Sequence, residues 1–512
     1  MRRTLVSITA VLAVVLAGAP GAALAAAPPQ PGSAGIGDPY YPDYGNGGYD
    51  VAHYEVRLRY WPESDRLVGT TTILARATQD LSRFNLDFVL DVSSVRVNNR
   101  PATFAREGAH ELVVTPARPL AAGQPMTVVV QYSGVPSSVS VPGVGTPWLR
   151  TAGGALAVGE PEIAWWWFPS NDHPLDKATF NISVLAPSDL EVLSNGVQRG
   201  APRPEITGWS RWSWQEANPM APYLAYVAIG NYDITRDTSA NGQQIINAYA
   251  TDMSPELANA SRASIERTDE IIDWASTLFG PYPFDARGGV VVPPLSLGFA
   301  LENQSRPVYD AVFWQRGASV YVVVHEIAHQ WFGDSVSVHH WGDMWLNEGF
   351  ATYTEWLWSE SQGEGTAQEL FDFTYNSIPA ADPFWQVIIG DPGAGSHNLF
   401  DLAVYDRGAM ALHQIRLAIG DDAFFTTLRR WAELKQHGNA RIEEFQALAE
   451  EVSGQDLEQV FTTWLFTPGR PDVTAGGTAA DAVTLRATSP MAPAQPRSWS
   501  AISETHRLLQ QR

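Results

Sequence analysis

Alternation of apolar and polar residues dominates the first half of the chain. From His53 to Tyr60 every second side chain is apolar, a period of two that predicts a β-strand with one buried face. Thr127–Tyr132 and Phe180–Leu185 also have the composition of strands. We therefore expect residues 46–238 to form a mostly antiparallel β domain. For the run Trp165–Trp167, packing in a core or domain interface is favoured over stacking on a sugar.

The pattern becomes helical near residue 240. Ser254-Pro255-Glu256 is typical of a helix start, because serine caps the first turn and proline fits within it, and this helix is expected to run to about Gly280. Gly289–Pro293 predicts a strand. Helices then dominate and are expected at residues 318–330, 347–363, 408–419 and 441–452. The fold class is therefore α+β and multidomain, with an α-rich domain at residues 239–473.

Both ends of the chain differ in composition from the middle. In residues 1–25, Arg2 and Arg3 precede a short apolar run, and Ala23-Leu24-Ala25 has the small-x-small pattern of a signal-peptide cleavage site. A retained membrane anchor is the alternative, but the run is shorter than the roughly 20 residues of a span. We expect cleavage and secretion to the extracellular medium, by the general or the twin-arginine route. Residues 26–45 predict a loose leader, and residues 474–512 a disordered tail.

Charge and cysteine content narrow the possible partners. The chain has 512 residues, a formal net charge of −22 and no cysteine. Such an acidic surface repels nucleic acid. An exported chain without cysteine depends on a large core rather than on disulfides. We expect no stable membrane anchor after signal cleavage, and the composition leaves the oligomeric state open.

The strongest chemical signal lies in the predicted helix 318–330. His325 and His329 are four residues apart, so their imidazoles lie on one face of the helix. Imidazole is a preferred zinc ligand, and Glu348 can supply a third, carboxylate ligand from the next helix. Three protein ligands and an open position for water are typical of a catalytic zinc site. The alternative is a helix whose histidines only form core hydrogen bonds, but burying such groups is costly without a cation.

Glu326 follows the first histidine on the same apolar helix. It is the natural general base, which takes a proton from the zinc-activated water and passes it to the leaving amine. Such a base contributes about 10²–10⁴ in rate. A solvated helix glutamate is the alternative, and the apolar surroundings argue against it.

These residues and four further segments carry a family resemblance. Eighteen residues separate His325-Glu326-x-x-His329 from Glu348, which lies within Trp345-Leu346-Asn347-Glu348-Gly349-Phe350-Ala351. The further segments are Tyr49-Asp50-Val51-x-His53-Tyr54, Phe168-Pro169-x-x-Asp172-x-Pro174-x-x-Lys177-Ala178, Ala300-Leu301-Glu302-Asn303 and Tyr405-Asp406-Arg407-Gly408. Together they resemble the aminopeptidase N family of gluzincin zinc metallopeptidases, in a short form without the C-terminal helical array. The resemblance covers residues 45–473 and implies a thermolysin-like catalytic domain with one zinc ion.

The resemblance also implies roles for residues around the zinc ligands. Tyr405 would stabilise the oxyanion, because a tyrosine hydroxyl is a neutral donor at pH 7. Glu302 and Glu160 would bind the α-amine of the substrate, and Asn303 would support the same pocket. Glu162 is an alternative to Glu160 for this role.

One substrate-binding segment departs from the family pattern, so the resemblance defines the substrate site less closely than the zinc site. In the segment that resembles the family's GxMEN element, Phe299 stands where a glycine is expected, with Gly298 one position earlier, and Leu301 replaces the methionine. A glycine there lets substrate approach the backbone closely.

Glu355 lies seven residues after Glu348, on the same helix face, and either orients a ligand histidine or is solvated.

The sequence therefore predicts an exported zinc aminopeptidase that hydrolyses the N-terminal residue from peptides with a free amino end. A zinc endopeptidase is the alternative, since Phe299 and the missing helical array both allow longer substrates. A non-catalytic peptide-binding protein on the same fold is a third hypothesis. Retention of Glu326 and Tyr405 argues against it, because zinc binding alone needs neither residue.

Overall fold

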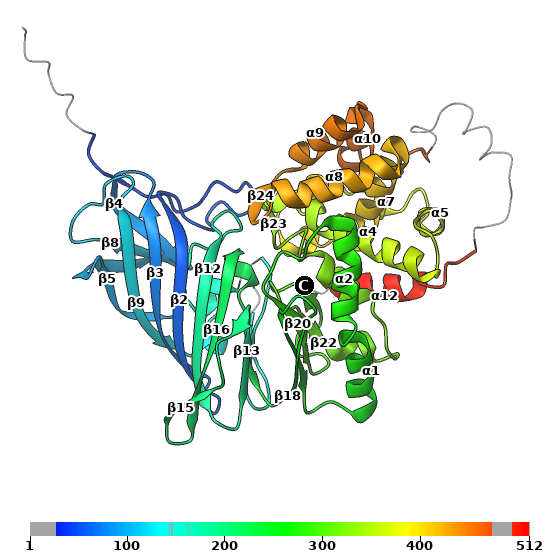
Figure 1. Cartoon of the computed structure of the whole chain (residues 1–512). Helices are drawn as coiled ribbons and strands as arrows, with labels where there is room; N and C mark the ends of the chain where they lie inside the picture. The colour runs from blue at the N-terminus through cyan, green and yellow to red at the C-terminus, as the bar shows by residue number, and fades with distance from the viewer. Residues whose placement is uncertain (1–26, 143, 145–146, 162, 474–493, 511–512) are drawn as a thin grey trace, which may run out of the picture.

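The computed structural model describes residues 27–142, 144, 147–161, 163–473 and 494–510. The predicted signal peptide, residues 1–25, and the alternative amine-binding residue Glu162 lie outside this part of the chain. A β-rich N-terminal domain lies beside a helix-rich domain (Figure 1). The predicted α+β class is confirmed.

The N-terminal domain is built on a long sheet with the strand order β14-β16-β12-β2-β3-β9-β5-β6, and β15 pairs with β16. Its pairs are antiparallel except β2 with β12, which are parallel. The predicted alternation is confirmed in β2, where Tyr54, Val56, Leu58 and Tyr60 are at most 2% exposed. The strands are β2 Tyr49–Trp61, β3 Arg66–Ala77, β5 Asp91–Val97, β6 Arg100–Pro101, β9 Pro125–Gly134, β12 Ala178–Pro187, β14 Val197–Gln198, β15 Arg203–Ile206 and β16 Trp209–Met220.

Two four-stranded sheets complete this domain, in the orders β1-β4-β8-β7 and β10-β11-β17-β13. The tryptophans of the run Trp165–Trp167 are at most 1% exposed, so they pack in the core as predicted. The strands are β1 Gln30–Pro31, β4 Leu81–Asp87, β7 Thr103–Glu107, β8 Glu111–Thr115, β10 Trp148–Arg150, β11 Ala155–Ala157, β13 Glu191–Ser194 and β17 Val227–Gly230. The 3₁₀ helices are η1 Pro136–Ser138, η2 Ala164–Trp166 and η3 Pro222–Leu224.

The second domain begins with a five-stranded sheet of order β18-β19-β20-β22-β21. Because β18 pairs with β19, residues 232–238 belong to the second sheet, and the domains meet a few residues before the predicted boundary. The strands are β18 Tyr232–Thr238, β19 Gln244–Ala250, β20 Ala286–Val292, β21 Ala300–Leu301 and β22 Val308–Asp310.

The predicted helix from residue 254 to about 280 is two helices, α1 Pro255–Ile265 and α2 Thr268–Phe279. Ser254 caps α1 as expected, since its hydroxyl accepts a hydrogen bond from the backbone N–H of Leu257. The break occurs because the N–H of Arg267 bonds to the carbonyl of Ser264, three residues back, where an α-helix bonds four residues back.

The remaining helices carry or surround the candidate zinc ligands. The predicted segments appear as α3 Tyr321–Ala328, α4 Trp345–Gln362, α7 Leu402–Ile419 and α9 Ile442–Ser453. The other elements are η4 Ala311–Trp314, β23 Val336–Val338, η5 Trp341–Asp343, α5 Ala367–Ser377, η6 Pro383–Gln386, α6 Ser396–Leu399, α8 Asp421–Leu434, β24 Gly438–Ala440, α10 Glu458–Phe461, the π-helix η7 Thr462–Phe466 and α12 Trp499–Leu509.

A glycine pair lets α4 and α7 approach closely. A Cβ atom built on Gly408 would lie 2.9 Å from the Cα of Gly349, and the indole N–H of Trp345 donates to the carbonyl of Gly408 at 3.1 Å. The backbones can therefore touch at this crossing. Glu348 and Tyr405, which flank these glycines in sequence, are brought to the same side of the domain.

The prediction of a loose leader is wrong for its described residues, 27–45. Asp38 is 1% exposed, and its carboxylate accepts the backbone N–H of Trp341 in the second domain at 2.8 Å. The same carboxylate lies 3.0 Å from Nε2 of His173 in the first domain. Apart from the two-residue strand β1, which pairs with β4, the described part of this segment is irregular, and contacts to both domains fix it.

The prediction of a disordered tail is wrong for residues 494–510 and lies outside the described residues for 474–493. Helix α12 packs against α3 and α7 and appears in red beside the zinc domain in Figure 1. Its buried side chains include Ile502, His506 and Leu509. An apolar stripe on one helix face explains why this short segment docks.

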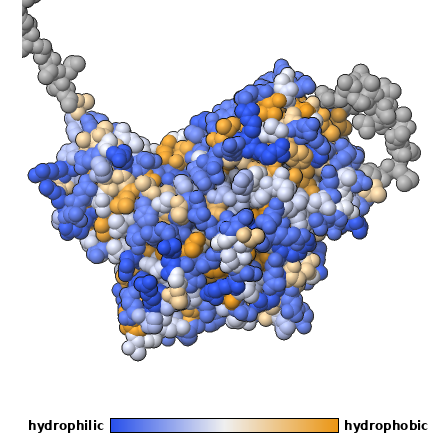
Figure 2. Space-filling view, in the orientation of Figure 1, coloured by the Kyte–Doolittle hydropathy of each residue, from blue (hydrophilic) through white to orange (hydrophobic). Residues whose placement is uncertain are grey.

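The surface is predominantly hydrophilic on the face shown in Figure 2, with apolar residues scattered across it. None of the helices in the described part of the chain combines the length and the apolar character of a membrane span.

Candidate active site

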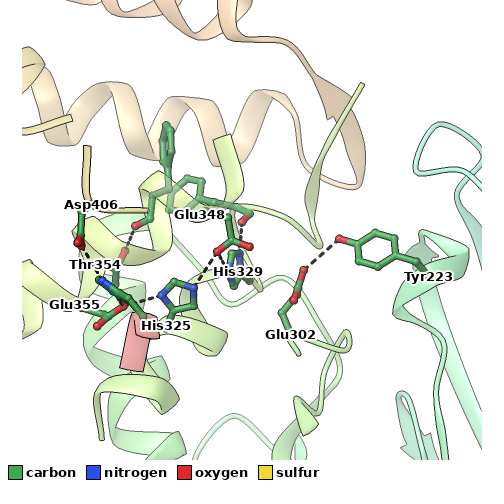
Figure 3. Close-up of polar contacts among 11 residues, drawn as sticks. Tyr223, Glu302, His325, His329, Glu348, Thr354, Glu355 and Asp406 are labelled. Atoms are coloured by element: carbon green, nitrogen blue, oxygen red, sulfur yellow. Dashed lines mark hydrogen bonds and ion pairs between the residues drawn. The ribbon is translucent and has the colours of Figure 1, made fainter. Parts of the chain in front are cut away.

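Helices α3 and α4 bring the three predicted zinc ligands together. Nε2 of His325 lies 3.0 Å from Oε2 of Glu348, and Nε2 of His329 lies 3.4 Å from the same oxygen. All three side chains are buried and converge in Figure 3. The i,i+4 spacing on α3 and the crossing of α4 produce this arrangement.

The other ring nitrogens show that the three residues fit a zinc ion. Nδ1 of His329 lies 3.0 Å from the carbonyl oxygen of Phe332, which can only accept, so this nitrogen carries the proton. Nδ1 of His325 lies 2.6 Å from Oε1 of Glu355 and is held in the same way. Both Nε2 lone pairs therefore face Glu348, as ligation by two imidazoles and one carboxylate requires.

The electrostatics also favour a cation at this point. Burial lowers the pKa of His325, but the carboxylates of Glu348 and Glu355 outweigh it and raise this pKa above its usual value. Burial likewise lowers the pKa of His329, which nearby carboxylates, Glu348 first among them, raise to about 10. The site thus holds an excess of negative charge, which a divalent cation neutralises in place of protons.

Glu355 orients a ligand histidine and is not solvated, which resolves the alternative left open by the sequence. It is fully buried, and Oε1 accepts hydrogen bonds from Nδ1 of His325 at 2.6 Å and from Nε2 of His506 at 2.9 Å. Nδ1 of His506 donates in turn to Oδ1 of Asp406 at 2.7 Å. Burial raises the pKa of Glu355, but the two histidines outweigh it and hold this pKa below its usual value.

The general-base and amine-binding candidates lie next to the ligands. Side-chain ligand atoms of Glu302, Glu326 and His329 lie within 4.8 Å of one another, and all three residues are buried. The hydroxyl of Tyr223 donates to Oε1 of Glu302 at 3.3 Å (Figure 3). Asn303 supports this loop, because its side-chain N–H donates to the carbonyl of Leu224 at 2.9 Å.

The structure adds a third acidic group to the predicted pair. Burial raises the pKa of Asp334 well above its usual value, and the nearby charges of Glu302 and Glu160 raise it further. Gln330 joins the groups, since its side-chain N–H donates to the carbonyl of Glu302 at 2.7 Å and to Oδ2 of Asp334 at 2.8 Å. Glu302 and Asp334 are thus linked through Gln330, and Glu160 is close enough for its charge to act on Asp334.

Tyr405 lies beside the first zinc ligand. Its ring stacks on the imidazole of His325, with centroids 5.7 Å apart and an interplanar angle of 25°, and the residue is buried. The close crossing of α4 and α7 brings it there from a distant part of the sequence. A phenol hydroxyl in this region can donate to an oxyanion.

Sequence reasoning missed four residues around this site: Tyr223, Gln330, Asp334 and His506. For Gln330 there was a signal, because it lies four residues after Glu326 and thus on the same helix face. Asp334 lies four residues after Gln330, in the turn that follows the helix. For Tyr223 and His506 no local pattern marks a role, since each meets the site only through the tertiary fold.

Two histidines one turn apart on one helix, a glutamate from the next helix and a β-rich domain beside them define a zinc metallopeptidase of the gluzincin class. Residues 263–464 match the family described as "Peptidase family M1 domain", and residues 51–224 match the family described as "Peptidase M1 N-terminal domain". The chain therefore belongs to peptidase family M1, the aminopeptidase N family, whose members use a catalytic zinc ion.

The chain is similar to longer curated aminopeptidases. It is 30% identical over 359 residues to aminopeptidase N of Streptomyces lividans, which covers 64% of this chain and 40% of that protein. It is 25% identical over 465 residues to glutamyl aminopeptidase of Rattus norvegicus, which covers 83% of this chain and 48% of that protein. The chain thus spans about half or less of the length of these relatives.

Solved structures match over their whole length. A variant of an M1 zinc metallopeptidase from Deinococcus radiodurans is 28% identical, with a TM-score of 0.75, and the match covers 86% of this chain and all of that chain. A two-domain M1 zinc metallopeptidase variant bound to L-arginine matches with a TM-score of 0.76 at 28% identity. The two domains described above are therefore an arrangement already seen in this family.

Proposed function

We propose that this protein is an exported zinc-dependent aminopeptidase that releases the N-terminal residue from peptides. The observation that carries the proposal is the position of the Glu302 carboxylate, in the group of atoms within 4.8 Å that also includes Glu326 and His329. An amine-binding acid next to the general base and a zinc ligand places the first peptide bond of a substrate at the reacting centre.

The residues divide the work as follows. Zinc held by His325, His329 and Glu348 would supply Lewis-acid polarisation of the scissile carbonyl and of water. Glu326 accepts the proton of the attacking water and passes it to the leaving amine. Tyr405 donates a hydrogen bond to the oxygen that gains negative charge.

The buried acids favour a free amino end over an internal peptide segment. Glu302, Glu160 and Asp334 are all buried, and placing several carboxyl groups together out of water is costly without a compensating cation. A substrate ammonium group provides that cation through charge-assisted hydrogen bonds. Related two-domain M1 structures are bound to L-arginine and to L-tryptophan, which supports a site that accepts a single amino acid.

Export is part of the proposal and is supported by the sequence of residues 1–25. Two arginines, an apolar run and the small-x-small site form the three regions of a secretory signal. The absence of cysteine from all 512 residues is compatible with an oxidising exterior. N-terminal sequencing of protein recovered from culture medium tests this, and a chain that stays inside the cell with residues 1–25 intact would contradict it.

The experiment that tests the activity uses matched peptides. A set of aminoacyl amides and a tripeptide are assayed with free and with acetylated amino ends, each with and without a zinc chelator. We expect cleavage of free-amine substrates alone, and loss of that cleavage with the chelator. Equal cleavage of free and acetylated peptides would replace the aminopeptidase by a zinc endopeptidase, and zinc binding without any cleavage would leave a peptide-binding protein.

Two variants identify the amine-binding group. Glu302→Ala should reduce cleavage of a free-amine substrate by the equivalent of roughly 2–5 kcal/mol, because the ammonium is left without its partner in a partly dry site. Glu160→Ala, measured on the same aminoacyl amide, is the comparison. If only Glu160→Ala has an effect, Phe299 has displaced the Glu302 segment from its family role.

A further inference from the structure

His506 connects the C-terminal helix to the zinc site. It lies on α12, beyond residues 263–464, which match the family description for the catalytic domain. The side chain is fully buried. Nε2 lies 2.9 Å from Oε1 of Glu355, and Nδ1 lies 2.7 Å from Oδ1 of Asp406. Both partners are carboxylates, so both ring nitrogens donate and the imidazole carries both protons.

The hydrogen bonds of Glu355 show what His506 does for the site. The same carboxylate oxygen, Oε1, accepts from Nδ1 of His325 and from Nε2 of His506. Two donors that meet at one oxygen fix the direction of this carboxylate more tightly than either donor alone. Without His506, Glu355 would keep one partner and an uncompensated negative charge in a buried position, which is costly.

Charge alternates along this chain of contacts. His325 meets Glu355, Glu355 meets His506, and His506 meets Asp406. Glu355 can therefore remain an ionised acceptor for Nδ1 of His325, because the charge of His506 compensates it. An ionised acceptor at Nδ1 raises the basicity of the ring and so strengthens metal ligation through Nε2.

Helix α12 has other contacts that hold it in place. The hydroxyls of Ser498 and Ser359 lie 2.7 Å apart, and the indole N–H of Trp499 donates to the hydroxyl of Thr374 at 3.2 Å. Ile502 and Leu509 are buried on the same helix. Docking of α12 and the contact of His506 with Glu355 are therefore separable by substitution.

We propose that His506 is a positioning residue of the zinc centre: from the C-terminal helix it holds Glu355 in the orientation that fixes His325 as a ligand. The proposal goes beyond the peptidase activity and rests only on zinc ligation by His325. Helix α12 is then part of the active centre, although it lies far from the zinc ligands in sequence.

The test is the zinc affinity of the full chain, measured by competition with a chromogenic chelator. His506→Gln keeps a similar volume, but a single amide cannot reproduce the geometry of two opposed ring donors. We expect its zinc dissociation constant to rise about 10–100-fold, the usual effect of removing an outer partner of a metal ligand. Asp406→Asn, which removes charge at the far end, should raise it by a smaller factor.

Ile502→Ala is the matched control, because it weakens α12 docking without touching the chain of contacts. It should lower Tm and leave the zinc dissociation constant within about twofold. With Co²⁺ in place of zinc, His506→Gln should shift the visible absorption bands, which report ligand geometry, whereas Ile502→Ala should not.

An unchanged zinc dissociation constant in His506→Gln would overturn the proposal. An equal rise in Ile502→Ala would overturn it as well, since helix docking alone would then account for the effect. Zinc affinity is measured without substrate, so failure of the aminopeptidase assays leaves this result readable.

Discussion

Replacing Arg407 by lysine should destabilise the protein although the positive charge is kept. The Arg407 guanidinium is fully buried. Its partners are backbone carbonyls, whereas a buried cation more often pairs with a carboxylate. Burial lowers the pKa of Arg407 to about 10. It donates to the carbonyl oxygens of Trp385, Val387, Thr463, Trp464 and Thr467 at 2.6–3.3 Å. These carbonyls lie in and beside η6 and η7, which Arg407 fastens to α7.

The size of the effect follows from the number of donors. A lysine ammonium has three N–H groups and cannot match the planar fork of arginine. At least two of the five carbonyls therefore lose their donor, at about 1–3 kcal/mol each. We expect Arg407→Lys to lower the free energy of unfolding by about 2–6 kcal/mol.

Urea unfolding, followed by tryptophan fluorescence and by circular dichroism at one fixed zinc concentration, measures this difference, because bound zinc itself stabilises the fold. Arg430→Lys is the control, since Arg430 forms an exposed ion pair with Glu451 at 3.0 Å, and such a pair contributes about 0–1 kcal/mol. If Arg407→Lys lies within about 1 kcal/mol of the unmutated protein, the carbonyl contacts do not have the role assigned to them.

Three further predictions concern the catalytic groups and a buried acid. Glu326→Gln should retain zinc and lose about 10²–10⁴ in turnover, as metal analysis beside peptide hydrolysis would show; near-normal turnover removes Glu326 as the base. Tyr405→Phe should lower kcat by about 10²–10³, whereas a change in KM alone would mean that Tyr405 only packs or binds substrate. Burial, with the charge of Asp87, raises the pKa of Glu111 to about 9. The folded state therefore keeps a proton that the unfolded state releases above pH of about 4.5. The contribution of this proton to the free energy of unfolding is full below that pH, and it falls as pH rises towards about 9. In unfolding measurements between pH 5 and 9, Glu111→Gln should remove this fall, which is at most about 1.4 kcal/mol per pH unit. The exposed Glu107→Gln is the control and should keep it. Parallel pH profiles for the unmutated protein and both variants would contradict the assignment.

The residues of the candidate zinc site could be found from the sequence because their signal is local. His325 and His329 share a helix face through their spacing, and Glu348 opens the next helix in a run that matches a family motif. The alternating strands and the Ser254 cap are local in the same sense. Each depends on neighbours within a few positions, which composition and periodicity report directly.

The leader and the C-terminal helix could not be predicted because their order comes from distant contacts. Asp38 meets Trp341, which is 303 residues away, and His506 meets Glu355, which is 151 residues away. The proline, glycine and alanine of the leader indicate only that it forms little structure alone. The apolar stripe of α12 is typical of an amphipathic helix but does not say which surface the helix meets. Whether such a segment is fixed depends on which surface it meets, and no local pattern records that.

Lys177 has a consequence for how the two domains can be recombined. From the first domain, its ammonium donates to the carbonyls of Asp334, Ser335 and Gly438 in the second domain at 2.7, 3.0 and 3.3 Å. The loop that carries Asp334 is thus braced by a group from the other domain. A chimera that joins the first domain of one relative to the second of another must keep this lysine and these three carbonyls in register. A peptidase domain expressed alone would therefore lack one support of the loop that carries Asp334.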